Sequence, residues 1–172
     1  MDIQNIGAVQ FREADTGSSL GRISLCPHKG CNFCCAEFNS GNYIVLYPGE
    51  LANAIASGSS LSHLTIIDEN YHGGARAICK ASEPKNCDGG YKPLDCACYP
   101  LFPRVLQSDI TVMHLIKGTK CPLVPTEIIE HANWVRDVWN RLISERPAVL
   151  AWLREVRLVG YESIECNSEG ES

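Results

Sequence analysis

The sequence predicts an α+β protein with a small, irregular, metal-bound and cysteine-rich core, a few short strands, and C-terminal helices that cover this core. Three observations predict this class. Four cysteines crowd into residues 26–35, and short runs of β-branched and aromatic residues are scattered through the middle of the chain. In the last third, apolar residues recur at helical spacing. The strands and helices are therefore expected to support whatever the cysteines bind.

Length and composition indicate one domain. A chain of 172 residues with 45% hydrophobic residues can bury a core of its own. We expect a single cysteine-cluster metal-binding domain over residues 1–160, followed by an acidic and flexible tail over residues 161–172. Lysine and arginine number 15 against 20 aspartate and glutamate residues, without a basic run, so nucleic acid is not an expected partner.

No segment predicts export or membrane insertion. The N-terminal stretch lacks the apolar run of a signal peptide, and no stretch reaches the roughly 18 consecutive apolar residues that a spanning helix needs. We therefore expect a cytoplasmic protein without a membrane partner. In a reducing compartment, the 10 cysteines favour metal ligation over disulfide bonds. An exported disulfide protein is the least favoured alternative.

Local patterns predict the strands of the middle region. The expected strands cover residues 43–47, 63–67, 75–80 and 109–116. A loop is expected over residues 68–74, which contain Asn70 and two glycines. Residues 82–95 are polar and contain Cys87, so a metal crosslink would explain how this stretch is held in place.

The helices are predicted from apolar periodicity and end signals. A short helix should follow Pro48, with Glu50 at its positive end. A longer amphipathic helix should begin at the N-cap Thr126 and end or kink at Pro147. A second one is expected over residues 148–158, and both helices should cover the metal-bearing part.

The candidate metal ligands form two groups of cysteines. The first group has the pattern CxxxxCxxCC, and the second is dispersed: Cys26, Cys31, Cys34 and Cys35, then Cys79, Cys87, Cys96 and Cys121. Closely spaced thiolates with Pro and Gly between them suit a zinc ion or an iron-sulfur cluster equally well. Neighbouring side chains in an extended backbone point in opposite directions, so the adjacent Cys34 and Cys35 suggest more than one metal. Eight thiolates would serve two four-coordinate zinc ions, or one cluster and one ion.

Two further residues near these groups are open alternatives. Cys98 could replace a neighbouring ligand, or it could be a small buried hydrophobic residue, as we expect for Cys166. His28 lies between Cys26 and Cys31 and could replace a thiolate, although a structural or solvated role is favoured.

The cysteine patterns resemble a known family. The CxxxxCxxCC motif, the segment YKPLDCACYP at residues 91–100 and the later Cys121-Pro122 are similar to the zinc- or iron-chelating cysteine-cluster family, often called CxxCxxCC proteins. The resemblance covers residues 26–122. It implies that Cys79 and Cys87 match the middle cysteines of the family, Cys96 the cysteine of its Arg-Pro-x-x-Cys segment, and Cys121 its last cysteine. The chain departs from the pattern at Ala97, where the family usually has Arg, and by the additional Cys98.

The resemblance implies metal chelation and little more. We expect a metal-binding protein that holds zinc or iron-sulfur through these thiolates, with the metal as its partner and another protein as an open second partner. The alternative is an iron-sulfur-dependent enzyme for electron transfer or protein side-chain modification. Some relatives in the family are linked to flagellin lysine N-methylation, but this chain has no glycine-rich loop of the kind expected for S-adenosylmethionine.

Overall fold

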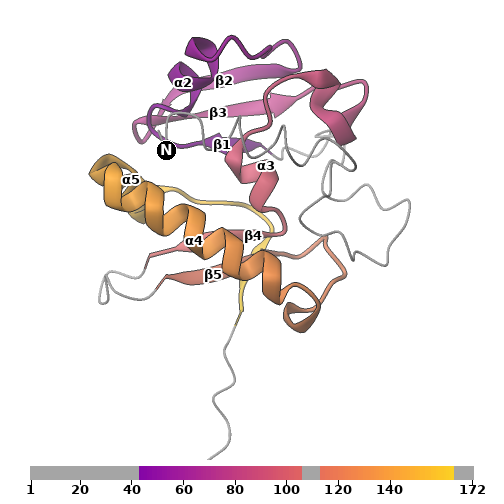
Figure 1. Cartoon of the computed structure of the whole chain (residues 1–172), viewed down its shortest axis with the longest axis vertical. Coiled ribbons are helices and arrows are strands. Elements are labelled where there is room, and N and C mark those ends of the chain that lie inside the picture. The colour runs from indigo at the N-terminus through magenta and orange to yellow at the C-terminus, as the bar shows by residue number, and fades with distance from the viewer. Residues whose placement is uncertain (1–42, 106–112, 165–172) are drawn as a thin grey trace, which may run out of the picture.

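The computed structural model describes residues 43–105 and 113–164, and for residues 84–86 the backbone alone. The elements, in chain order, are β1 Ile44–Leu46, α2 Glu50–Ala56, β2 Leu64–Tyr71, β3 Gly74–Cys79, the 3-10 helix η3 Pro84–Gly89, α3 Leu94–Cys98, β4 Leu101–Arg104, β5 His114–Gly118, the 3-10 helix η4 Pro125–Glu127, α4 Ile129–Glu145, α5 Pro147–Glu155 and β6 Tyr161–Ser163. Figure 1 shows two small sheets with α3 between them and α4 crossing the lower one.

Both sheets are antiparallel and have three strands. The first has the order β1-β3-β2, and β3 in its centre pairs Ala75 with Leu46 and Ala77 with Ile44. The second has the order β4-β5-β6, so the strand nearest the end of the described chain pairs with β5. The α+β class predicted from the sequence is therefore confirmed.

The largest core of the described residues is built from aromatic and aliphatic side chains. The Trp139 and Trp152 rings stack with their centroids 6.3 Å apart, and the Phe102 ring meets Trp139 edge-on at 5.4 Å. These three side chains come from α4, α5 and β4, and all are at most 1% exposed. Burial of large rings at this density removes several hundred Å² of apolar surface from water, on the order of several kcal/mol. This core joins the two long helices to the second sheet.

Helix α4 forms because its apolar residues recur every three or four positions. Val135, Val138, Trp139 and Leu142 are all buried on one stripe, while the opposite face carries exposed polar residues. Pro147 stands at the first position of α5, where its missing N–H costs nothing, so the two helices meet at this residue.

Several expected elements differ from the structure. Strand β2 continues through residues 68–71, so the loop predicted there is wrong, and the chain turns instead at His72 and Gly73, whose φ angles are 54° and 92°. Strand β4 was not predicted, because Pro100 and Pro103 flank and interrupt its short apolar run.

The C-terminal third also differs in detail. The N-cap predicted at Thr126 is wrong, because Thr126 lies inside η4 and α4 begins at Ile129. The segment expected as a flexible tail begins with β6, whose Tyr161 pairs with Gly118 of β5. Among the described residues, no helix combines the length and apolar character needed to cross a membrane.

Candidate metal centre

The first cysteine group lies outside the described residues. Cys26, Cys31, Cys34 and Cys35 belong to it, and His28 and Cys166 also fall outside the described ranges. The structure therefore bears directly on the later cysteines and on the segments that carry them.

The four later candidate ligands are spread over four segments. Cys79 ends β3 and is half-buried, and Cys96 is half-buried on α3. Cys87 lies in η3 with a positive φ of 55° and is 6% exposed. Cys121 follows β5 and is also 6% exposed. No disulfide bond joins any two cysteines of the described residues.

Two buried carboxylates dock the segment that carries Cys96. Glu50 accepts hydrogen bonds from the backbone N–H of Tyr47 at 2.9 Å, the Tyr91 hydroxyl at 2.9 Å and the backbone N–H of Leu94 at 2.8 Å. Asp95 accepts one from the backbone N–H of Val45 at 3.0 Å. Because an unsatisfied buried polar group is costly, these bonds fix α3 against β1 and the start of α2.

The surroundings of these carboxylates shift their protonation towards the neutral form. Burial raises the pKa of Glu50 to about 7, and the nearby charge of Asp95 also raises it. The three hydrogen-bond donors lower this pKa and so oppose the shift. Burial also raises the pKa of Asp95 to about 7, opposed by the Val45 N–H. Burial and then the charge of Glu50 raise the pKa of Tyr91 well above its ordinary value, so its hydroxyl stays a proton donor. Glu50 and Asp95 therefore both have pKa values near neutral pH.

Hydrogen bonds hold the polar stretch around Cys87. The Asp88 carboxylate accepts from the backbone N–H groups of Ser82 at 2.9 Å and Glu83 at 2.6 Å, and these bonds lower its pKa. The Tyr91 backbone N–H donates to Ser60 at 2.9 Å. The order of this stretch therefore has a source besides the metal crosslink that the sequence suggested.

Cys98 has the surroundings of a core residue. It is 0% exposed, and its Sγ accepts a hydrogen bond from the Trp139 Nε1–H at 3.2 Å. This tryptophan belongs to the central aromatic cluster, so Cys98 links α3 to α4. The surroundings favour the buried-hydrophobic alternative for this cysteine over a ligand role.

Cys121 lies in a loop that is fixed by β5, and Tyr99, which follows α3, approaches this loop at Gly118. Its backbone N–H donates to Gly118 at 3.3 Å, and the buried Lys117 ammonium donates to its carbonyl at 2.6 Å. A Cβ on Gly118 would lie 2.8 Å from the Tyr99 ring, so glycine is what lets the segment after Cys98 approach this loop. Cys121 also lines a cavity of about 340 Å³ that includes Thr119 and Pro122.

Sequence patterns missed several buried polar side chains near these segments, among them Glu50, Asp95 and His63. Glu50 was placed at a helix start, but its burial and its bonds to Tyr91 and Leu94 were not predicted, and Asp95 was noted only as part of a motif. His63 is 2% exposed and lies between the segments of Cys79 and Cys87: its carbonyl accepts from the Lys80 N–H at 2.7 Å, and Gly90 packs on its ring. Burial lowers the pKa of His63.

The described residues do not form a complete metal site by themselves. Over residues 43–105 and 113–164, no three Cys, His, Asp or Glu side chains lie close enough together to hold one ion. No protein-family model, curated protein or solved structure matches the chain.

Proposed function

We propose that this chain is a metal-binding protein that holds zinc or iron-sulfur through clustered cysteine thiolates. The observation that carries the proposal is the dense CxxxxCxxCC motif of residues 26–35 together with four later cysteines on structured segments. Thiolates are the ligands that zinc and iron-sulfur clusters prefer, and residues 26–35 supply them at metal-ligand spacing. The proposed ligands are Cys26, Cys31, Cys34, Cys35, Cys79, Cys87, Cys96 and Cys121.

The positions of the later cysteines constrain how such a site would be assembled. Within the described residues, no three potential ligands lie together. A four-coordinate site would then be completed from the first cysteine group, which supplies four thiolates. If all eight cysteines serve two such sites, we propose that each site combines thiolates from both groups.

The docked segment of α3 fits a role as one side of this site. Glu50 and Asp95 fix the helix that carries Cys96 through hydrogen bonds of 2.8–3.0 Å, so the thiol is held before any metal binds. A ligand fixed in this way loses little conformational entropy on coordination. A bound zinc ion would crosslink distant segments, whereas an iron-sulfur cluster would add one-electron transfer and so favour the enzyme alternative.

Metal analysis with an absorption spectrum on anaerobically purified protein tests the proposal. We expect stoichiometric zinc in a colourless protein, or iron with broad visible absorbance that bleaches on reduction. Cys31→Ser and Cys34→Ser should each lower the metal content by about half or more, because each removes one ligand of a four-coordinate site. Visible absorbance would support the redox alternative, and colourless protein with zinc would rule that alternative out.

Cys166→Ser is the matched control, because it removes a thiol that lies outside both groups. Its metal content should equal that of the unaltered protein. Protein without zinc or iron, with unchanged melting temperatures for Cys31→Ser and Cys34→Ser, would contradict the proposal.

A further inference from the structure

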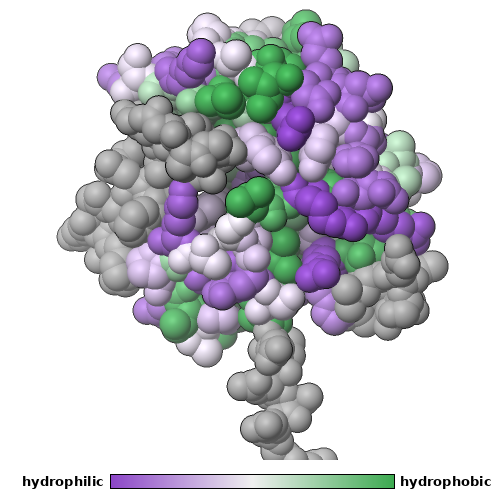
Figure 2. Space-filling model, turned by 180° about the vertical axis from the view of Figure 1, so that it is seen from behind, coloured by the Kyte–Doolittle hydropathy of each residue, from purple (hydrophilic) through white to green (hydrophobic). Residues whose placement is uncertain are grey.

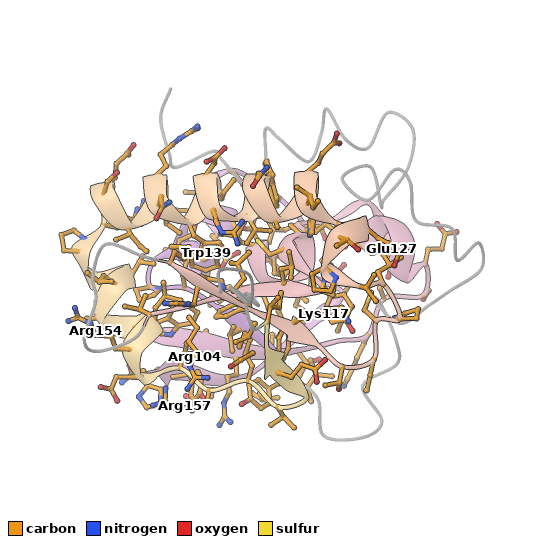
Figure 3. All side chains as sticks on the ribbon, turned by 90° about the horizontal axis from the view of Figure 1, so that it is seen from below. Arg104, Lys117, Glu127, Trp139, Arg154 and Arg157 are labelled. Carbon is orange, nitrogen blue, oxygen red and sulfur yellow. The ribbon has the colours of Figure 1, made fainter. Side chains whose placement is uncertain are left out.

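A second cavity lies between the second sheet and the end of α5, and no cysteine is among the residues that line it. It measures about 430 Å³, within the range of small-molecule sites. Three arginines line it: Arg104 at the end of β4, Arg154 in the last turn of α5, and Arg157 just after that helix. In Figure 3, all three lie in the half of the molecule opposite to Glu127, with Arg154 nearest its end. The back face of the molecule, seen in Figure 2, carries hydrophilic patches beside smaller hydrophobic ones.

The residues that line this cavity carry positive charge, whereas the chain as a whole is negatively charged. The whole chain has a formal net charge of −5, yet no aspartate or glutamate is among the residues that line the cavity. Within the described residues, none of the three arginines forms an ion pair; the ion pair that does occur joins Arg76 to Asp68. Three guanidinium groups in one cavity without a described carboxylate create a local positive potential.

The arginines are held by the protein backbone and side chains in ways that leave donors for a ligand. The Arg157 Nη1 donates to the carbonyls of Arg154 and Val156, both at 2.9 Å, which fixes this side chain on the C-terminal turn of α5. Arg104 makes a long contact of 3.4 Å to the Ser163 hydroxyl. Among the residues that the structure describes, the buried Nε of Arg154 has no hydrogen-bond partner. A buried guanidinium N–H without an acceptor is costly, so a bound acceptor would relieve that cost.

The remaining wall is apolar and aromatic. Val105, Ile116, Leu158 and the Tyr161 ring line this side of the cavity, and all four are partly exposed. A purely ionic ligand would leave this wall uncovered. The cavity thus combines an anion-binding edge with a surface that suits an apolar or aromatic group.

We propose that this cavity binds a small phosphate monoester that carries an apolar or aromatic group, with the phosphate between Arg104, Arg154 and Arg157. Each guanidinium group can bind phosphate oxygens through a pair of N–H donors. A phosphate group has more oxygens than a carboxylate, so it suits three arginines better as a ligand. An extended polyanion is disfavoured, because the negative net charge of the chain would repel it beyond the cavity. This proposal does not depend on the cysteines.

Isothermal titration calorimetry with phenyl phosphate, inorganic phosphate and benzoate tests it on the full-length protein. Phenyl phosphate should bind saturably and at least about tenfold more tightly than either of the others, because it alone supplies both the phosphate and the ring. Its affinity should fall as salt rises. Arg154→Gln and Arg104→Gln should each weaken phenyl phosphate binding at least about tenfold, since each removes a charge-assisted donor.

Arg141→Gln is the control, because Arg141 is an exposed arginine of α4 that does not line the cavity. Circular dichroism spectra and melting curves verify that each variant is folded, and Arg104→Gln, at an exposed position, remains informative if Arg154→Gln is unstable. Equal affinities for Arg141→Gln, Arg154→Gln and Arg104→Gln would overturn the proposal. So would benzoate or inorganic phosphate binding as tightly as phenyl phosphate, or no saturable binding at all.

Discussion

Glu50 shows how one buried carboxylate can hold two distant parts of the chain together. It stands at the first position of α2, yet its Oε1 accepts from the Tyr91 hydroxyl and the Leu94 N–H, more than 40 residues away. The sequence predicted a helix start here, because Pro48 and an acidic residue are local signals. The burial of Glu50 depends on the later segment packing over it, and no local pattern carries that information.

Glu50→Gln should change both the level and the pH dependence of stability. The raised pKa, from 4.5 to about 7, means that the folded state binds more protons than the unfolded state between these values. Stability from this group is therefore fully present below about pH 4.5 and is lost by about pH 7, a change on the order of 3 kcal/mol. Glutamine cannot titrate, so the variant should have a flatter profile in urea unfolding at pH 5 to 8.

The same variant should also be less stable at pH 5. In the unaltered protein, the Tyr47 N–H donates to Glu50 Oε2. In the variant, the amide NH2 would face this N–H, and two donors without an acceptor would cost about 1–3 kcal/mol. The gap to the unaltered protein should narrow towards pH 8. Glu130→Gln, at an exposed position of α4, is the control and should leave the profile unchanged. Parallel profiles for Glu50→Gln and the unaltered protein would show that Glu50 does not titrate in this range.

At the scale of elements, the first sheet and α5 meet at Gly74. The Trp152 Nε1–H of α5 donates to the carbonyl of Tyr71 at 3.1 Å, at the turn between β2 and β3. A Cβ on Gly74 would lie 2.2 Å from the Leu46 carbonyl oxygen and 2.7 Å from the Trp152 Nε1. Glycine is therefore needed here for the close approach of β1 and α5.

Gly74→Ala should destabilise the protein by at least about 2 kcal/mol, because a backbone atom of β1 and a buried ring would have to move. Its φ lies outside the positive region, so the whole cost comes from packing. Chemical denaturation measures the loss, and near-UV circular dichroism should show an altered signal from Trp152, which is 1% exposed.

Gly58→Ala gives a matched comparison. Nothing lies within 4 Å of its Cβ position, but its φ is 72°, so only backbone strain of about 1–2 kcal/mol is expected. The near-UV signal should then be unchanged. If Gly74→Ala behaved like Gly58→Ala in both measurements, the close packing of α5 on the first sheet would be disproved.

The elements that sequence patterns predicted are those with a strong local signal. Strand β1 and helix α4 follow from β-branched composition and from the buried stripe of α4. Strands β4 and β6 have three or four residues each, and their pairing with β5 across the chain decides their existence. Such pairing depends on tertiary contacts, which a local pattern does not record.

At the scale of the whole molecule, the cysteines of the candidate site were predictable but their arrangement was not. Metal-ligand spacing is a local property, so residues 26–35 stand out in the sequence. Which later cysteines approach one another depends on how α3 and the loop after β5 are placed. The structure adds that the described residues bring no three potential ligands together.

The described fold also has a core in which Cys121 is the one proposed ligand and the other side chains pack without a metal. Trp139, Trp152 and Phe102 pack among α4, α5 and β4, and the buried carboxylates connect α3 to β1. Small domains that depend on zinc for folding lack such a core and unfold when the metal is removed. We therefore expect metal to stabilise this chain without being required for the fold of its described part.

Chelation should accordingly lower the melting temperature but leave the protein folded at 25 °C. For metal at about a thousand times its dissociation constant, removal costs about 4 kcal/mol, which corresponds to a fall of roughly 10 °C for a chain of this length. Tryptophan emission should stay blue-shifted after chelation, because Trp139 and Trp152 are each 1% exposed within the aromatic core. The Cys166→Ser protein should respond as the unaltered protein does. Emission that shifts to the wavelength of the urea-denatured chain on chelation alone would show that the metal, rather than this core, holds the molecule together.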